Sequence, residues 1–261
     1  MKKNVAMLCD FGMDDAIALL YLLENAHLFN KIDLLPVAGN FPLSKTFVNA
    51  KRLLTAVPSL PRNIRIVDTS VVPQQGADIP EIHGSDGMGD LLPSTYEEVV
   101  PVLEYTTWLE EVDEAYVIVS LGPCTVTLDI LNKKGKRPLI MMAGNVAEPP
   151  NYLGYEFNHA LDLDAFAACM PYTDACATLD TCHDPQCDLN RILPQAEGLF
   201  GKMLTRYRQM SNARNEAVCA VYDLTAVVYL LHPERFEIEM TTDRDGNRIP
   251  MLQYIHLEPL L

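Results

Sequence analysis

The chain has 261 residues, of which 49% are hydrophobic, and a formal net charge of −15. This length and apolar content suffice for one large core. No Gly/Ser linker, low-complexity tract or fixed repeat divides the chain, so we expect a single domain over residues 1–261. The acidic field would repel a phosphate backbone, which argues against a nucleic-acid partner, whereas it suits a protein that binds cations and a neutral small molecule.

The N-terminus and the cysteines bear on location. Met-Lys-Lys is followed only by the short apolar run 5–8, whereas a signal peptide needs a longer run and a cleavage site. No stretch approaches about 18 apolar residues, so we expect no membrane span. The seven scattered cysteines do not form a disulfide framework. We therefore expect a cytoplasmic protein. The sequence leaves its oligomeric state open, with a homo-oligomer among the states allowed.

Short apolar runs alternate with helical patterns along the chain, in the order typical of an α/β protein. We expect an open, mainly parallel, Rossmann-like central sheet flanked by helices. The predicted strands cover residues 5–9, 34–38, 64–67, 115–121, 139–143 and, more weakly, 175–179. The predicted helices cover residues 14–24, 43–56, 96–109, 125–131, 165–170, 199–210 and 225–231. A turn at residues 245–247 predicts a hairpin in the tail that follows Phe236.

Three carboxylates, Asp10, Asp14 and Asp15, lie within six residues at the first strand–helix junction. Any one of them could simply cap the helix, which is worth about 0.3–2 kcal/mol. Two carboxylates about 5 Å apart in a partly buried turn, however, repel by roughly 3 kcal/mol at an effective dielectric near 20. Such a cluster needs a bound cation or a proton. Carboxylate oxygens suit calcium or magnesium rather than zinc.

The segment Asp10-Phe11-Gly12-Met13-Asp14-Asp15-Ala16 resembles the Asp-Pro-Gly-x-Asp-Asp-Ala signature of the inosine–uridine nucleoside hydrolases. Five further segments match the family in its order. They are Gly39-Asn40, the loop 83–87 (His-Gly-Ser-Asp-Gly), the segment 121–125 (Leu-Gly-Pro-Cys-Thr), Glu156-Phe157-Asn158, and the segment 222–226 (Tyr-Asp-Leu-Thr-Ala). Each match is weak alone. As an ordered set over residues 10–226 they cover most of the chain.

The resemblance implies calcium-dependent hydrolysis of the N-glycosidic bond of ribonucleosides, in purine and pyrimidine salvage. It implies that Asp14 is the general base, while His83 and Tyr222 face the nucleobase. The calcium ligands that it implies are Asp10, Asp15, the carbonyl of Thr125 and Asp223. The substrate-binding residues that it implies, mainly toward the ribose, are Asn40, Asn151, Glu156, Phe157 and Asn158.

Three positions depart from the family pattern. Leu8 stands where the family usually has Asp, Phe11 replaces Pro, and Tyr222 replaces a His thought to protonate the departing purine. Loss of the first carboxylate could weaken metal binding. These changes leave the preferred base open, and they motivate an alternative function: a non-catalytic member of the fold that binds ribosides or calcium.

Two other site types fit the sequence less well. A metal-dependent phosphohydrolase would need basic residues near the acidic turn, and none is found there. Cys182, His183 and Cys187 invite a zinc interpretation, but the spacing is not a usual zinc pattern and lacks a second ligand pair. We therefore predict neither phosphate chemistry nor a zinc site.

Overall fold

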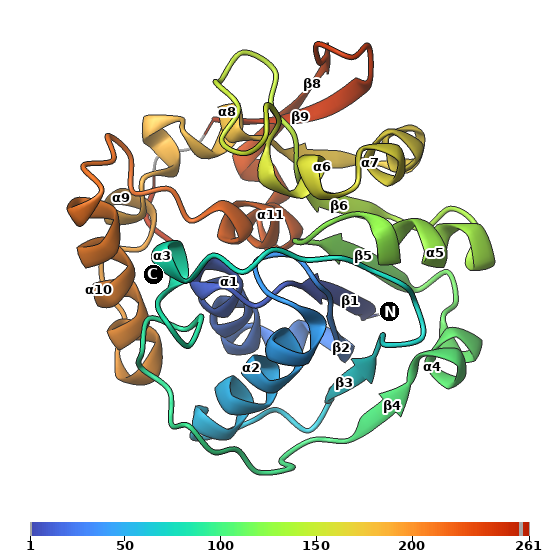
Figure 1. Ribbon diagram of the computed structural model, residues 1–261, viewed down its shortest axis with the longest axis vertical. Coiled ribbons are helices and arrows are strands. Elements are labelled where there is room, and N and C mark those ends of the chain that lie inside the picture. Colours follow the sequence, from blue (N-terminus) through green and yellow to red (C-terminus); the bar gives the residue numbers. More distant parts are fainter. Residues whose placement is uncertain (1, 256–257, 261) are drawn as a thin grey trace.

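The computed structural model describes residues 2–255 and 258–260. The strands of these residues form one nine-stranded sheet in the order β4-β3-β2-β1-β5-β6-β7-β9-β8 (Figure 1). Neighbouring strands are parallel except for the antiparallel pair β8 and β9. The strands are β1 (Lys3–Cys9), β2 (Phe29–Pro36), β3 (Ile64–Asp68), β4 (Val102–Glu104), β5 (Tyr116–Ser120), β6 (Leu139–Met142), β7 (Ala175–Ala177), β8 (Phe236–Thr242) and β9 (Arg248–Tyr254). The predicted open, mainly parallel α/β fold is confirmed.

Helices cover both faces of the sheet. They are α1 (Met13–Glu24), α2 (Leu43–Ala56), α3 (Pro80–His83), α4 (Tyr105–Glu111), α5 (Thr125–Lys134), α6 (Phe157–Leu161), α7 (Leu163–Cys169), α8 (Leu179–Cys182), α9 (Leu189–Ile192), α10 (Gly198–Ala213) and α11 (Tyr222–Leu231).

Successive side chains of a strand point to opposite faces, and the core divides accordingly. On β1, Met7 packs in the cluster that includes α1, α2, α10 and α11, whereas Leu8 packs in the cluster that includes α4, α5 and α7. The result is a three-layer arrangement (Figure 1). Among the described residues, no helix combines the length and apolar character needed to cross a bilayer.

The strand order places a topological switch point beside β1. The chain leaves β1 for β2, β3 and β4, and β5 then pairs with the opposite edge of β1. In open α/β sheets such a reversal leaves a crevice outside the carboxyl ends of the two strands. Asp10 directly follows β1 and Leu121 directly follows β5. The acidic turn therefore lies where this fold places its ligands.

Several predicted element bounds were wrong. The predicted helix over residues 96–109 is extended at its start. It contains β4, which pairs with β3, and is helical only from Tyr105. Pro101 explains the difference, since it lacks an N–H and disfavours helical backbone at the residue before it. The predicted strand over 175–179 ends at Ala177, because the Thr178 side chain accepts the Thr181 N–H and starts α8. The C-terminal hairpin is confirmed.

Candidate active site

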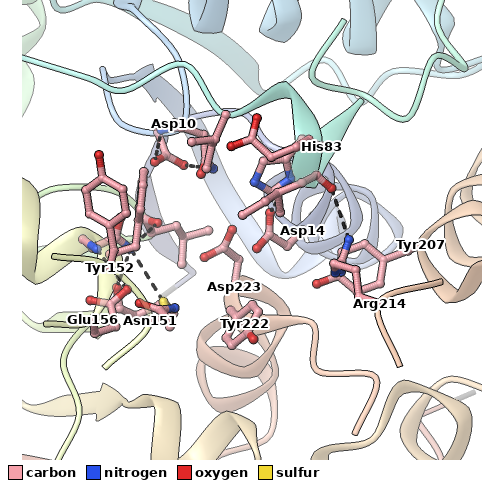
Figure 2. Close-up of a pocket in the computed structure, with 18 of the residues that line it drawn as sticks. Asp10, Asp14, His83, Asn151, Tyr152, Glu156, Tyr207, Arg214, Tyr222 and Asp223 are labelled. Carbon is pink, nitrogen blue, oxygen red and sulfur yellow. Dashed lines mark hydrogen bonds and ion pairs between the residues drawn. The ribbon is translucent and has the colours of Figure 1, made fainter. Parts of the chain in front are cut away.

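A cavity of about 430 Å³ lies at the carboxyl edge of the sheet. Figure 2 shows Asp14 and Asp223 in the middle of the cavity, with Asn151 and Glu156 on one side and Tyr207 and Arg214 on the other; Asp10 lies above them in this view. The residues that line it come from the loops after β1, β2, β5 and β6, from the end of β6, from α1, α3, α6 and α10, from the segment after α10, and from the start of α11. They are Asp10, Asp14, Asn40, Ile79, Glu81, Ile82, His83, Leu121, Met142, Asn151, Tyr152, Glu156, Phe157, Asn158, Tyr207, Arg214, Glu216, Tyr222 and Asp223.

Three acidic side chains converge beside this cavity. Asp14 and Asp15 lie in the first turn of α1, and Asp223 lies in the first turn of α11. Each offers one oxygen, and the three oxygens lie within 4.8 Å of one another. The positive ends of both helix dipoles point at this cluster and favour negative charge there. Two helix N-termini thus bring together carboxylates that are more than 200 residues apart in sequence.

The donor set fits a hard cation. One oxygen each of Asp14 and Asp15 is buried and has no hydrogen-bond partner among the described residues. Burial, and then repulsion from neighbouring carboxylates, raises the pKa of Asp15 and of Asp223 well above the ordinary range. A bound divalent cation would satisfy the unpaired oxygens and neutralise the repulsion. Asp14, Asp15 and Asp223, with Asp10 beside them, are therefore the residues that could hold a metal.

Asp10 is held by the loop that follows β2. Its two carboxylate oxygens accept the backbone N–H of Asn40 at 2.8 Å and the Asn40 side-chain amide at 2.9 Å. Burial raises the pKa of Asp10 to about 7, although the hydrogen bond from the Asn40 backbone N–H opposes the shift. Asp10 also depends on Gly39, because a Cβ there would lie 1.9 Å from an Asp10 oxygen. The predicted pair Asp10 and Asn40 is thus one hydrogen-bonded unit.

The turn that carries the cluster is strained at Phe11. This residue has φ of 43°, a left-handed conformation that non-glycine residues rarely adopt and that a proline cannot adopt. Its side chain is fully buried, which holds the turn in place. Gly12 instead has an ordinary φ of −84° and is needed for space. A Cβ on Gly12 would lie 2.7 Å from His83 and 2.8 Å from Asn40.

A polar wall faces the cluster from the end of β6. Glu156 caps α6, and its carboxylate accepts the backbone N–H groups of Gly144, Asn158 and His159 at 2.8–3.0 Å. The Asn158 amide donates to the carbonyls of Leu121 and Met142, both at 3.0 Å. Its side-chain oxygen is buried and has no hydrogen-bond partner in the described part of the chain, so it can accept a hydrogen bond from a ligand. Hydroxyl groups are the ligand chemistry that this wall fits.

His83 and Tyr222 also line the cavity. The Met13 N–H donates to Nδ1 of His83 at 3.2 Å, so Nε2 carries the ring proton. Burial lowers the pKa of His83, which keeps the imidazole neutral. His83 is therefore a neutral N–H donor. Burial also raises the pKa of Tyr222, so its hydroxyl stays protonated.

The structure gathers most of the predicted residues at one cavity. Asn151 and Phe157 line it with the others. Two predicted calcium ligands are not among the described residues that line it. Asp15 is fully buried behind the surface, and Thr125 begins α5 with its hydroxyl donating to Asp162.

The sequence did not predict the part of the site that α10 and the segment after it contribute. Tyr207 is buried and donates from its hydroxyl to the Ala220 carbonyl at 2.6 Å. Arg214 pairs with Glu216, with its Nε 2.6 Å from one carboxylate oxygen. All three side chains line the cavity. No local motif marks them, because a tyrosine on a helix core face and a surface ion pair are ordinary features.

Comparison with known proteins agrees with this geometry. The sequence profile of the family "inosine-uridine preferring nucleoside hydrolase" matches residues 5–250. Pyrimidine-specific ribonucleoside hydrolases RihA from Shewanella sp. strains MR-7 and MR-4 are each 30% identical to this chain. Each match covers 74% of this chain, and the chain spans only 64% of the length of these relatives.

Solved structures share the fold. An inosine-guanosine nucleoside hydrolase superposes with a TM-score of 0.67 at 19% identity, covering 96% of this chain and 87% of that one. A purine-preferring ribonucleoside hydrolase from Gardnerella vaginalis gives 0.68 at 19% identity, covering 98% and 94%. An inosine-uridine preferring enzyme from Bacillus anthracis gives 0.66 at 14% identity, covering 97% and 95%. With a profile match over nearly its whole length, this chain belongs to the inosine–uridine preferring nucleoside hydrolase family.

Proposed function

We propose that this protein hydrolyses the N-glycosidic bond of ribonucleosides to ribose and free base, with calcium at the acidic cluster. The observation that carries the proposal is the pairing of two surfaces in one cavity. Converging carboxylates with unpaired oxygens lie across from Glu156 and Asn158, which fit hydroxyl groups. Relatives named as ribonucleoside hydrolases support the same activity. Such a reaction would return free bases to salvage in the cytoplasm.

The metal-ligand set that we propose is Asp10, Asp15, Asp223 and the carbonyl of Thr125. Calcium held there would supply Lewis-acid chemistry that acidifies a water and orients the ribose diol. Asp14 lines the cavity and takes the proton of the attacking water. Its position among the cluster also suits a metal ligand, so its role needs a direct test.

The remaining residues bind and orient the sugar. The reaction passes through an oxocarbenium-like transition state, in which positive charge develops on the ribose. The unpaired oxygen of Asn158 and the carboxylate of Glu156 accept hydrogen bonds from ribose hydroxyls, with Asn40 and Asn151 beside them. A fixed ribose turns the encounter with the water into a near-unimolecular attack. His83 and Tyr222 donate hydrogen bonds to the departing base.

The cavity does not fit a phosphate ester. Among the described residues that line it, Arg214 is the one cation, and its guanidinium is paired with Glu216. The carboxylates that line the rest of the cavity would repel a phosphoryl group. A neutral riboside is therefore the better substrate. The alternative is a non-catalytic role in binding ribosides or calcium. Turnover in an activity assay would exclude it.

The test is a turnover assay with p-nitrophenyl riboside, inosine, uridine and 2′-deoxyinosine, with saturating calcium and with a chelator. We expect cleavage of the ribosides that depends on calcium. We expect kcat/KM for 2′-deoxyinosine at least about 10²-fold below that for inosine, because buried groups built for a hydroxyl are left unpaired. Equal rates for those two would contradict the ribose site. Cleavage of none of the four would favour the non-catalytic alternative.

A further inference from the structure

A chain of three side chains leads from the cavity to the protein surface. The Tyr222 hydroxyl lies 3.1 Å from Nε2 of His183, and Nδ1 of His183 lies 2.9 Å from a carboxylate oxygen of Glu148. Tyr222 lines the cavity (Figure 2), whereas His183 and Glu148 are not among the described residues that do. Their side chains are 32% and 39% exposed. The outer end of the chain can therefore exchange protons with water.

The surrounding structure fixes this chain of hydrogen bonds. Asp180, on the short helix that precedes His183, accepts the backbone N–H groups of Val146, Ala147 and Glu148 at 2.7, 2.7 and 2.9 Å. The segment that carries His183 thus holds the loop that carries its partner Glu148. Cys182 lies 3.7 Å from the Tyr222 carbonyl through its Sγ, so α8 also contacts α11. Asp180 and Cys182, which are close to His183 in sequence, thus position its two partners, Glu148 and Tyr222.

We propose that Glu148 and His183 form a proton relay to Tyr222, which donates the proton to the departing nucleobase. This inference rests on the proposed function and assigns positioning residues to it. With a neutral ring, Nδ1–H donates to Glu148 and Nε2 accepts the Tyr222 O–H, so the phenolic hydrogen is committed to His183. With a protonated ring, Nε2–H donates to the Tyr222 oxygen. The phenolic hydrogen is then free for a base in the cavity.

The step balances as a transfer of two protons. When the C1′–N bond breaks, its electron pair goes to the base, which takes the phenolic proton of Tyr222. The Tyr222 oxygen takes the Nε2 proton of His183, and the ring is left neutral until water reprotonates it. A tyrosine alone is a weak acid, with an ordinary pKa of about 10. The relay avoids a lasting tyrosinate and replaces it with a neutral imidazole.

Charged and polar groups surround His183. Glu148 provides a carboxylate at hydrogen-bond distance from the neighbouring loop, and Tyr222 on α11 provides a neutral hydroxyl. On its own segment, Asp180 and Asp184 add negative charge while their oxygens accept backbone N–H groups.

The chain contains a matched control outside the cavity. The Tyr21 hydroxyl lies 3.0 Å from Nε2 of His232, and Nδ1 of His232 lies 3.4 Å from Glu234. The His232 side chain is 32% exposed, the same as that of His183. None of these three residues is among the described residues that line the cavity. His232→Ala thus removes an equivalent Tyr–His–Glu arrangement without touching the proposed relay.

The experiment measures kcat and KM of the wild type, His183→Ala, Glu148→Gln and His232→Ala on inosine, uridine and p-nitrophenyl riboside. We expect His183→Ala to lower kcat for inosine and uridine by about 10²-fold, the usual contribution of a general acid, with little change in KM. The loss for p-nitrophenyl riboside should be at least about tenfold smaller, because its leaving phenolate needs no proton. Glu148→Gln should also lower kcat for inosine and uridine more than kcat for p-nitrophenyl riboside. His232→Ala should leave the ratio of these kcat values as in the wild type.

The relay would be overturned if His183→Ala lowered kcat equally for all three substrates or for none of them. A similar change in the ratio of kcat values in His232→Ala would overturn it as well. Tyr222→Phe, which removes only the hydroxyl, must show the same leaving-group dependence and serves if His183→Ala does not fold. A wild-type protein that cleaves none of the substrates would remove the proposed function together with the relay. A wild-type protein that cleaves the substrates, with equal loss of kcat on all of them in His183→Ala, would remove the relay alone.

Discussion

A buried carboxylate without a partner is unfavourable, and this protein holds several such groups in one place. Asp14 and Asp15 each leave a buried oxygen unpaired, and burial raises the pKa of Asp10 to about 7. Strain at Phe11 is located in the same turn. Features of this kind persist where function requires them, because stability alone would remove them. At the residue scale, the acidic turn has the features of a site that could hold a cation, and these features do not favour the stability of the metal-free fold.

The raised carboxyl pKa values predict how the metal-free protein responds to pH. Burial raises the pKa of both Asp10 and Glu156 to about 7, so the folded state binds more protons than the unfolded state between their ordinary values and about 7. Stability from these groups is therefore fully present at low pH and falls as pH rises toward 7. The lowered pKa of His83 acts in the opposite direction over part of this range.

Unfolding of the chelated protein should be measured between about pH 5 and about pH 8, with and without calcium. We expect the metal-free protein to lose stability as pH rises, and calcium to remove most of that loss because it binds the deprotonated carboxylates. Asp10→Asn, which removes one titrating carboxyl, should flatten the metal-free slope. Stability that rises with pH in the chelated wild type would contradict the assignment.

At the scale of elements, the site depends on the close approach of three elements. The start of α1 lies next to the loop after β2 and next to α3. Gly12 precedes α1, and its backbone N–H donates to the Asp15 carboxylate at 2.8 Å. Asn40 and His83 lie so near that a Cβ on Gly12 would approach both within 2.8 Å. The absence of a side chain at Gly12 is therefore what lets three separate elements meet.

Gly12→Ala should destabilise the protein by about 1–3 kcal/mol, the usual cost of overpacking a tight site. It should also lower kcat/KM, because His83 and Asn40 must move. Gly246→Ala is the control, since Gly246 has φ of 87° in the hairpin turn and open space around it. That variant should lose stability through backbone strain and keep its kinetic constants. A Gly12→Ala enzyme with wild-type stability and activity would be inconsistent with the crowding described.

The sequence predicted those elements whose pattern is local. The helix over residues 43–56 was predicted with the bounds of α2, and the hairpin followed from its turn. The extended start of the predicted helix 96–109 was missed, because pairing of the edge strand β4 with β3 is a tertiary contact that periodicity does not show. At the site, the residues in motifs at strand ends were found. Tyr207, Arg214 and Glu216 were missed, since their position depends on how α10 packs across the cavity.

At the scale of the whole molecule, the sheet order and the charge act together. The switch point beside β1 opens the crevice, and the net charge of −15 gives the surroundings a potential that attracts cations. Each loop after a central strand then contributes one part of the site: the acidic turn after β1, Asn40 after β2, and Glu156 with Asn158 after β6. The single domain and the cytoplasmic location stay predictions of the sequence, which leaves the oligomeric state open.

The central claim is that one calcium ion at the acidic cluster makes the cavity catalytic while Asp14 acts as the base. The most direct test titrates calcium into metal-stripped wild type and Asp14→Asn by calorimetry and assays riboside cleavage in the same samples. Asp164→Asn, at an exposed first-turn position of α7, is the control variant. We predict one calcium site in all three proteins, activity that rises with its occupancy, and a loss of at least about 10²-fold in kcat for Asp14→Asn alone. Full activity in the chelated wild type, or no calcium binding to its folded form, would contradict the account.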